Sequence, residues 1–408
     1  MTSAASIPSE SSASSASSES SASSATKRRV GPAWLFSRNV DLAVFLGSAA
    51  VSFGALGIGA LTGILQDETP GWAWIPAVIL CDVAHVWSTA FRTYLDPAER
   101  RVRPWLLALV PLLGLAASVA LFAVGELAFW RALAYLAIFH FVRQQYGWVS
   151  LYRARAGETG RMGRLIDTVA IYAATVWPLL HWHTHLPRRF SWFVPDDVVA
   201  LPSFVMPVAT VLYVAALSAY AVRSAIMWLR GTPNPGKDVV VVTTAAAWYV
   251  GIVAFDSDYA FTVTNVFMHG IPYFALVYAH TRARARSASA LASASALASA
   301  SASACPPSLA ERLTRNVLVY LAALWLVAFA EELVWDRAVW HDHAWLFGEG
   351  WDVGALKLLI VPLLALPQLT HYVLDGFIWR RRTNPSVAGL VRVPSTEPAY
   401  VTLSTSSP

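Results

Sequence analysis

Four histidines lie inside apolar stretches of the sequence, each in a different stretch. They are His85, His140, His269 and His371. A basic residue follows each of them by seven to thirteen positions, at Arg92, Arg153, Arg282 and Arg380 respectively. On a helix this spacing corresponds to roughly 10–20 Å from the end of the stretch. Imidazole is the commonest protein ligand for metal ions, so four of them at a common depth predict a metal site shared by four helices.

Two carboxylates stand at helical spacing from these histidines. Asp82 precedes His85 by three residues, and Asp375 follows His371 by four, in "THYVLDGFIWR". Residues at these spacings share a helix face. The second nitrogen of a ligating histidine commonly donates to a carboxylate, so we expect Asp82 and Asp375 to orient His85 and His371. Imidazoles with few carboxylates suit iron, copper or zinc.

Arg143 is the residue that favours a different interpretation. It follows His140 by three residues in "HFVRQQYGW", and a cation is a poor neighbour for a bare metal ion. It could pair with Asp82 or Asp375, or it could belong with them to the proton or substrate pathway of a transporter. In a third interpretation the three residues are polar contacts between helices of a structural protein. We find no internal repeat of the kind transporters often have, which favours an enzyme with Asp82, Arg143 and Asp375 as candidate catalytic residues.

The composition indicates the setting of these residues. Of 408 residues, 56% are hydrophobic and only 13% are charged, whereas soluble domains carry about 25% charged residues. The 18 tryptophans are typical of the aromatic belts at bilayer interfaces. The net charge of +5 does not indicate nucleic-acid binding, because the basic residues gather at the ends of apolar stretches. We therefore expect an all-α, polytopic protein of the inner membrane.

Ten apolar stretches are long enough to cross a bilayer, at about 20 residues each. They lie near 40–65, 72–95, 104–125, 128–151, 164–183, 203–229, 238–256, 258–281, 315–336 and 355–379. Basic clusters follow the second, fourth, sixth, eighth and tenth stretches, while acidic or neutral loops follow the first, third, seventh and ninth. By the positive-inside rule this alternation predicts ten spans with both termini in the cytoplasm.

The remaining segments are polar or of low complexity. We expect a disordered Ser/Ala-rich tail (1–38), a membrane bundle of eight spans (39–284), a cytoplasmic linker (285–310), two further spans (311–382) and a polar tail (383–408). The linker could be partly an alanine-rich helix.

Five further histidines fall on the predicted outer side, in "HWHTH" (His181, His183, His185) and "HDH" (His341, His343). Those of "HWHTH" could meet in a strand-like turn and form a second metal site, although histidine beside tryptophan is also common at membrane interfaces.

The pattern of one histidine in each of four spans resembles the Brp/Blh family of integral-membrane β-carotene dioxygenases. "THYVLDGFIWR" is similar to the last motif of that family, "IFHFVRQQ" to the second and "FMHGIPYF" to the third. In the first motif, "CDVAHVWSTAFR", the aspartate precedes the histidine, whereas in the family it follows.

The resemblance implies a non-haem iron site held by His85, His140, His269 and His371, and a lipophilic, carotenoid-like substrate. The clustered histidine boxes of membrane desaturases are absent from the sequence. The sequence thus predicts a metal-dependent membrane oxygenase, with a membrane transporter as the alternative.

Overall fold

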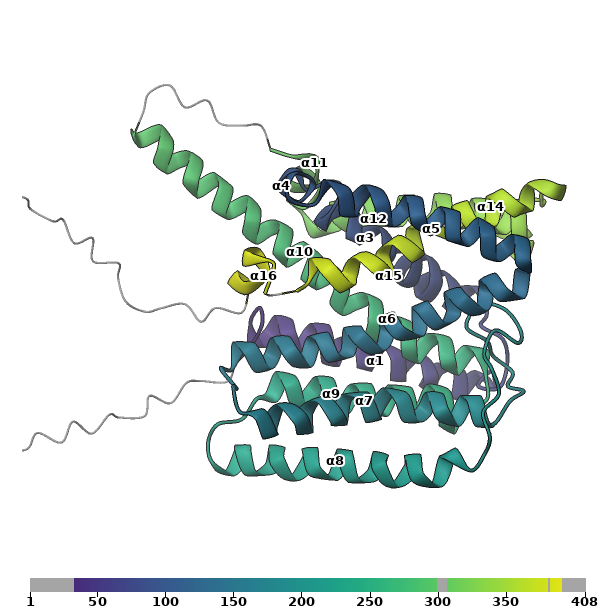
Figure 1. Cartoon of the computed structure of the whole chain (residues 1–408), viewed down its shortest axis with the longest axis horizontal. Coiled ribbons are helices and arrows are strands. Elements are labelled where there is room, and N and C mark those ends of the chain that lie inside the picture. Colours follow the sequence, from purple (N-terminus) through teal and green to yellow (C-terminus); the bar gives the residue numbers. More distant parts are fainter. Residues whose placement is uncertain (1–32, 299–306, 381, 391–408) are drawn as a thin grey trace, which may run out of the picture.

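A computed structural model describes residues 33–298, 307–380 and 382–390 of the chain (Figure 1). Within these ranges every regular element is a helix and there is no strand. The all-helical prediction is therefore confirmed. Most of the predicted N-terminal tail and most of the C-terminal tail lie outside the described residues.

Ten helical stretches correspond to the ten apolar stretches of the sequence. They are α1 (Arg38–Thr62); α2, η1 and α3 (Gly71–Trp74, Ile75–Val83, Ala84–Arg92); α5 (Pro104–Val124); α6 (Glu126–Arg155); α7 (Arg161–Thr184); α8 (Val205–Leu229); α9 and η2 (Pro235–Trp248, Tyr249–Ala254); α10 (Asp258–Ala298); α12 and η3 (Val317–Trp335, Asp336–Trp340); and η4, α14 and α15 (Gly354–Leu356, Lys357–Leu364, Leu366–Ile378). Short helices α4 (Pro97–Val102), α11 (Leu309–Leu313), α13 (Ala344–Phe347) and α16 (Pro385–Leu390) lie between or after them. Helix α10 extends into the predicted linker as far as Ala298.

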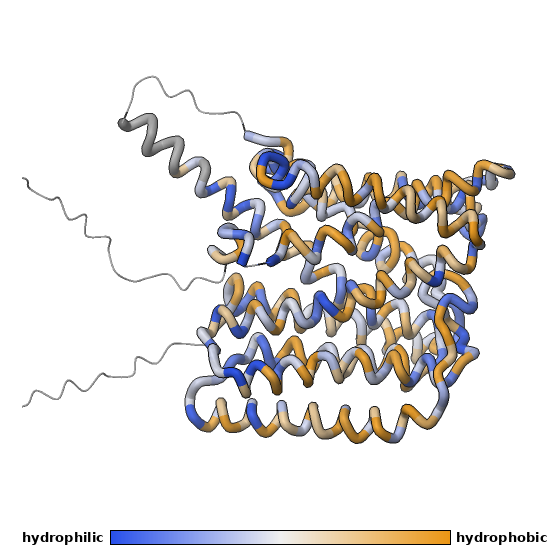
Figure 2. Tube along the Cα trace, in the orientation of Figure 1, coloured by the Kyte–Doolittle hydropathy of each residue, from blue (hydrophilic) through white to orange (hydrophobic). Residues whose placement is uncertain are grey.

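Among the described residues, eight of these stretches are long and apolar enough to cross a membrane. Helices α6 and α7, which match the predicted fourth and fifth spans, do not meet that criterion because both carry many polar and charged residues. Hydrophobic residues dominate the middle of the bundle, and hydrophilic residues concentrate at its two ends (Figure 2). The chain thus has the polarity pattern of a helical membrane protein.

Helix α10 lies at the centre of the bundle and α8 at its edge (Figure 1). In its apolar window 78% of the α10 residues are buried inside the protein, against 11% of those of α8. Gly270 allows α10 to approach η1 closely, since a Cβ there would lie 2.6 Å from the sulfur of Cys81. This close approach brings the residue before Gly270, His269, to the helix that carries His85.

An ion-pair cluster joins helices α6, α7, α8 and α9 near one end of the bundle. Glu158, in the loop between α6 and α7, accepts hydrogen bonds from Lys237 at 2.8 Å and Arg223 at 2.5 Å. Asp167 on α7 is fully buried and contacts the same two cations, with Arg153 as a third. Burial of the Glu158 carboxyl raises its pKa, but Lys237, Asn234 and Arg223 outweigh that effect and hold the pKa at about 2.

The Glu158→Gln variant tests what this cluster contributes. We expect it to destabilise the protein by on the order of 3 kcal/mol, because it leaves three cations against one carboxylate. Thermal denaturation of the purified protein in detergent measures the effect. Glu68→Gln, the same change at an exposed position, is the control and should leave the midpoint unchanged.

The pH dependence of this difference follows from the pKa of Glu158. That pKa is lower in the folded protein than its ordinary value of 4.5, so the carboxylate stabilises the fold above about pH 4.5 and stops doing so as the pH falls towards 2. The difference between wild type and Glu158→Gln should shrink over that range. A difference that stayed constant would contradict the ion-pair explanation.

Candidate metal centre

The four histidines predicted from the sequence converge in the structure. His85 lies on α3, His140 on α6, His269 on α10 and His371 on α15, and each side chain is at most 4% exposed. One ligand nitrogen from each lies within 4.8 Å of the other three. Within the described residues this is the one group of three or more histidine, cysteine or acidic side chains that could hold a metal ion.

The separations between nitrogens suit a shared ion. The Nε2 atoms of His85 and His269 are 3.0 Å apart, and those of His140 and His371 are 3.1 Å apart. Two ligands at 2.0–2.1 Å from one ion, at angles of 90–109°, are separated by about 2.8–3.4 Å. The two pairs therefore have the spacing of neighbouring ligands. In addition, one ion would take up the Nε2 lone pairs that face one another in each pair.

Irregular helix geometry brings these side chains together. His85 follows the nine-residue π-helix η1, a wide helical form that often occurs at functional sites. His371 lies on α15, which begins after a break in the helix at Ala365, because Pro367 has no backbone N–H to donate.

An aromatic ring also packs against one of the histidines. The Phe141 ring stacks on the His269 ring with 3.5 Å between ring centres.

A hydrogen-bond chain runs from His371 to Asp375 through two other helices. The Nδ1 atom of His371 lies 2.6 Å from the Thr89 hydroxyl, which lies 2.9 Å from the Tyr273 hydroxyl. Tyr273 donates its single proton to Asp375, so Thr89 must donate to Tyr273 and His371 Nδ1 must donate to Thr89. This leaves the Nε2 lone pair of His371 facing the other imidazoles, which is the tautomer a metal ligand needs.

The predicted direct hydrogen bonds from the histidines to Asp82 and Asp375 are not formed. Asp375 lies 3.8 Å from His371 Nδ1 and acts through Thr89 and Tyr273 instead. Asp82 lies 3.6 Å from His85 Nδ1, which is too long for a hydrogen bond. The sequence spacing correctly predicted that each carboxylate lies near its histidine. The group closest to His371 Nδ1, however, is the Thr89 hydroxyl, which lies on another helix.

Sequence reasoning missed Thr89 and Tyr273, although a signal for both is present. Each of the four histidines is followed four residues later by a polar side chain on the same helix face. These side chains are Thr89, Gln144, Tyr273 and Asp375. Gln144 donates to the backbone carbonyl of His269 at 3.0 Å. These four polar side chains form a second layer, one helical turn from the four histidines. Three of them, Thr89, Tyr273 and Asp375, form the hydrogen-bond chain described above.

Arg143 does not pair with Asp82 or Asp375, contrary to one of the sequence predictions. Its guanidinium donates to the Tyr172 hydroxyl and lies 4.8 Å over the Tyr146 ring. It forms no ion pair with a carboxylate anywhere in the part of the chain that the structure describes.

The histidines of "HWHTH" do not form the predicted strand-like turn, because α7 continues through Thr184. His181 and His185 stack with 3.9 Å between ring centres, and His183 contacts the Tyr135 hydroxyl. Together with His341 and His343 they form no cluster of three potential ligands among the described residues.

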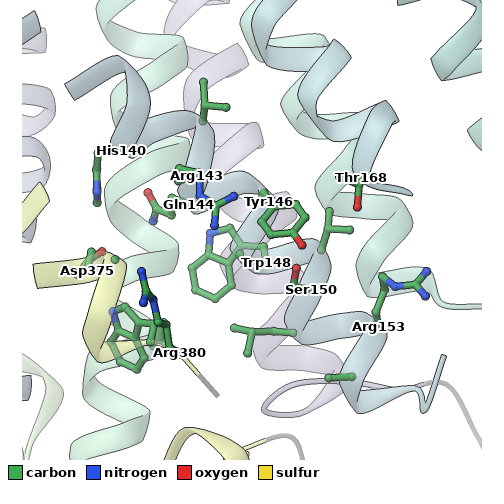
Figure 3. Close-up of a pocket in the computed structure, with 18 of the residues that line it drawn as sticks. His140, Arg143, Gln144, Tyr146, Trp148, Ser150, Arg153, Thr168, Asp375 and Arg380 are labelled. Carbon is green, nitrogen blue, oxygen red and sulfur yellow. The ribbon is translucent and has the colours of Figure 1, made fainter. Parts of the chain in front are cut away.

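A cavity of about 800 Å³ adjoins His140, one of the four histidines (Figure 3). Its lining includes His140, Tyr273, Tyr372 and Asp375, together with Arg143 and Arg380. It therefore gives a small molecule a route to His140.

No family model matches this chain, and neither a curated protein nor a solved structure is similar enough to it to count as a relative.

We predict that His371→Ala and His140→Ala each lose most of the transition metal that the wild-type protein binds, because each removes one of four converging ligands. Metal content after loading and desalting, measured by mass spectrometry, checks this. His183→Ala removes a similarly buried histidine outside the cluster and should bind metal as wild type does. Equal metal content in all four proteins would contradict the ligand assignment.

Tyr273→Phe should weaken metal binding about 10- to 100-fold, as expected for the loss of a group that orients a ligand. It interrupts the chain that fixes the His371 tautomer but leaves every imidazole in place. Titration of the metal-free protein measures the affinity, and melting of the metal-free protein checks that the fold is intact. Tyr278→Phe, on the same helix, is the control. An unchanged affinity in Tyr273→Phe would show that the chain does not orient His371.

Proposed function

We propose that this chain is an integral-membrane, metal-dependent oxygenase, with non-haem iron as the preferred ion and copper or zinc as alternatives. Its substrate in this proposal is a lipophilic, carotenoid-like molecule that reaches the site from the bilayer. We further propose that α6 and α7 cross the membrane with the other eight stretches, which gives ten spans in the inner membrane with both termini in the cytoplasm.

The observation that carries the proposal is the convergence of four buried imidazoles with ligand spacing. Four neutral histidines suit iron, copper or zinc, whereas magnesium and calcium prefer oxygen ligands. The similarity of the histidine motifs to those of the Brp/Blh family is the basis for the substrate class. The polar character of α6 supports its place as a span, because its polar residues include His140 and Gln144, which face the site.

The residues around the site have separate roles in this proposal. His85, His140, His269 and His371 hold the ion, which when bound supplies the centre at which O₂ reacts. Asp375, Tyr273 and Thr89 keep the Nε2 lone pair of His371 directed at it.

Two aromatic side chains border the site on different sides. Phe141 covers one face of His269 and excludes water there. Tyr372, whose ring centre is 4.9 Å from that of His140, lies at the cavity and would contact the substrate.

A dioxygenase reaction is consistent with such a site. Cleavage of a C=C bond by O₂ places one oxygen atom on each carbon and yields two C=O groups, so atoms and electrons balance without a separate reductant. The cavity beside His140 offers room for the double bond of an apolar substrate.

A membrane transporter is the second candidate, and Arg143 is the observation that favours it. A charged side chain within a spanning helix costs about 2.5–3.5 kcal/mol and usually serves function. In a transporter Arg143 and the histidine layer would bind the transported ion or solute.

The two candidates are distinguished by turnover. Iron-loaded protein in nanodiscs should consume β-carotene or a related polyene only when O₂ is present, with loss of the polyene absorbance and formation of carbonyl products seen by chromatography. His371→Ala should be inactive, and His183→Ala should match wild type. Failure to bind iron, copper or zinc after reconstitution with each ion would overturn the oxygenase proposal.

A further inference from the structure

The cavity beside His140 carries an excess of positive charge. Five arginines line it, and they are Arg143, Arg153, Arg164, Arg380 and Arg382. The two carboxylates that line it are already engaged, since Glu158 binds Lys237, Arg223 and Arg153, and Asp375 accepts from Tyr273. Among the arginines only Arg153 has a carboxylate partner in the described ranges. The cavity thus presents four cations without a matching anion.

Three of these cations have an ordinary explanation. Arg164 lies at the start of α7, and Arg380 and Arg382 follow the end of α15. Basic residues are common where spans leave the membrane. Their charge would still attract anions to the cavity, because clefts lined by one sign of charge concentrate the opposite sign.

Arg143 has no such explanation. It lies ten residues before Arg153 on α6, about 15 Å deeper along the helix axis, and only one turn from His140. In Figure 3 it lies on the cavity wall between His140 and Tyr146. Its side chain is exposed to the cavity, and the Tyr172 hydroxyl and the Tyr146 ring hold its guanidinium in place. The guanidinium has five N–H donors, and only the one to Tyr172 is engaged in the structure.

The cavity also has apolar and aromatic walls, formed by Tyr146, Trp148, Leu151, Leu276 and Trp379. The uncharged polar side chains of Gln144, Ser150 and Thr168 line it as well. A ligand that matches both features has an oxyanion for Arg143 and an extended apolar body for these side chains. Arginine binds carboxylates and phosphates in a bidentate manner, so both head groups fit.

We propose that this cavity binds an anionic amphiphile, a molecule with a carboxylate or phosphate group on an apolar chain, and that Arg143 pairs with its anionic group one helical turn from His140. That this amphiphile is the substrate of the four-histidine site rests on the proposed function. Binding itself does not, because Arg143 is not a metal ligand.

Binding to the metal-free protein tests the proposal separately from catalysis. The probe is cis-parinarate, a fluorescent polyene fatty acid, and its methyl ester is the neutral control. Both are titrated into chelator-treated protein in zwitterionic nanodiscs, with empty nanodiscs as the baseline. The acid should bind wild type more tightly than the ester does.

Arg143→Gln should weaken binding of the acid about 10- to 100-fold, the range expected for a charge-assisted hydrogen bond, and leave binding of the ester unchanged. Arg143→Lys should restore much of the affinity. Arg131→Gln, on the same helix but outside the cavity, is the matched control and should bind the acid as wild type does. Melting of each variant in the nanodiscs checks that it is folded.

Competition then identifies the head group. Displacement of the probe by oleate assigns a carboxylate, and displacement by 1-oleoyl lysophosphatidate assigns a phosphate ester. The proposal is overturned if acid and ester bind wild type equally, if neither binds, or if folded Arg143→Gln binds the acid as tightly as Arg131→Gln. Tight, Arg143-dependent binding without any turnover would retain this proposal and count against the oxygenase.

Discussion

A polar group inside an apolar helical bundle must form its hydrogen bonds with other groups of the protein, because no water is available there to form them. Much of the architecture follows from this constraint. At one end of the bundle, Glu158 and Asp167 neutralise cations from three helices and hold α6 to α9 together. At the centre, Thr89, Tyr273 and Asp375 satisfy one another and the outer nitrogen of His371. The first cluster joins four helices that follow one another in the chain, whereas the second joins α3, α10 and α15, which are far apart in sequence.

The groups that remain without a partner are as informative as those that are satisfied. The Nδ1 atoms of His85 and His269 are buried and unpaired, and the guanidinium of Arg143 lies at the cavity and pairs with no carboxylate of the described residues. A buried polar group without a partner is costly and calls for an explanation, such as a catalytic role or a bound ion or water. The converging Nε2 atoms of the four histidines and the exposed guanidinium of Arg143 lie about one helical turn apart, so the two features suit one site that holds an ion and a ligand beside it.

Helix α10 connects these features. It is the most buried of the eight membrane-like stretches, and it carries both His269 and Tyr273. Gly270 between them allows the close contact with η1. Helix α10 therefore supplies His269 as a candidate metal ligand and Tyr273 as part of the hydrogen-bond chain that orients His371. Its close contact with η1 at Gly270 also brings α3, and with it His85, near His269. A larger residue at position 270 would separate the histidines without altering any of them.

The sequence by itself determined the helices and the candidate ligands. Apolar length and periodicity are local properties, so the ten predicted stretches match helices closely, and the spacing of each histidine from the following arginine was enough to place all four in one layer. The sequence also shows a polar residue four positions after each histidine, but it does not show which groups these residues contact.

Only the tertiary structure decided which helices meet. The partner of His371 is 282 positions away at Thr89, Arg143 contacts Tyr172 rather than Asp82 or Asp375, and "HWHTH" remains helical. Such contacts depend on how helices pack side by side, and helical periodicity says which face a residue occupies but not which face lies opposite.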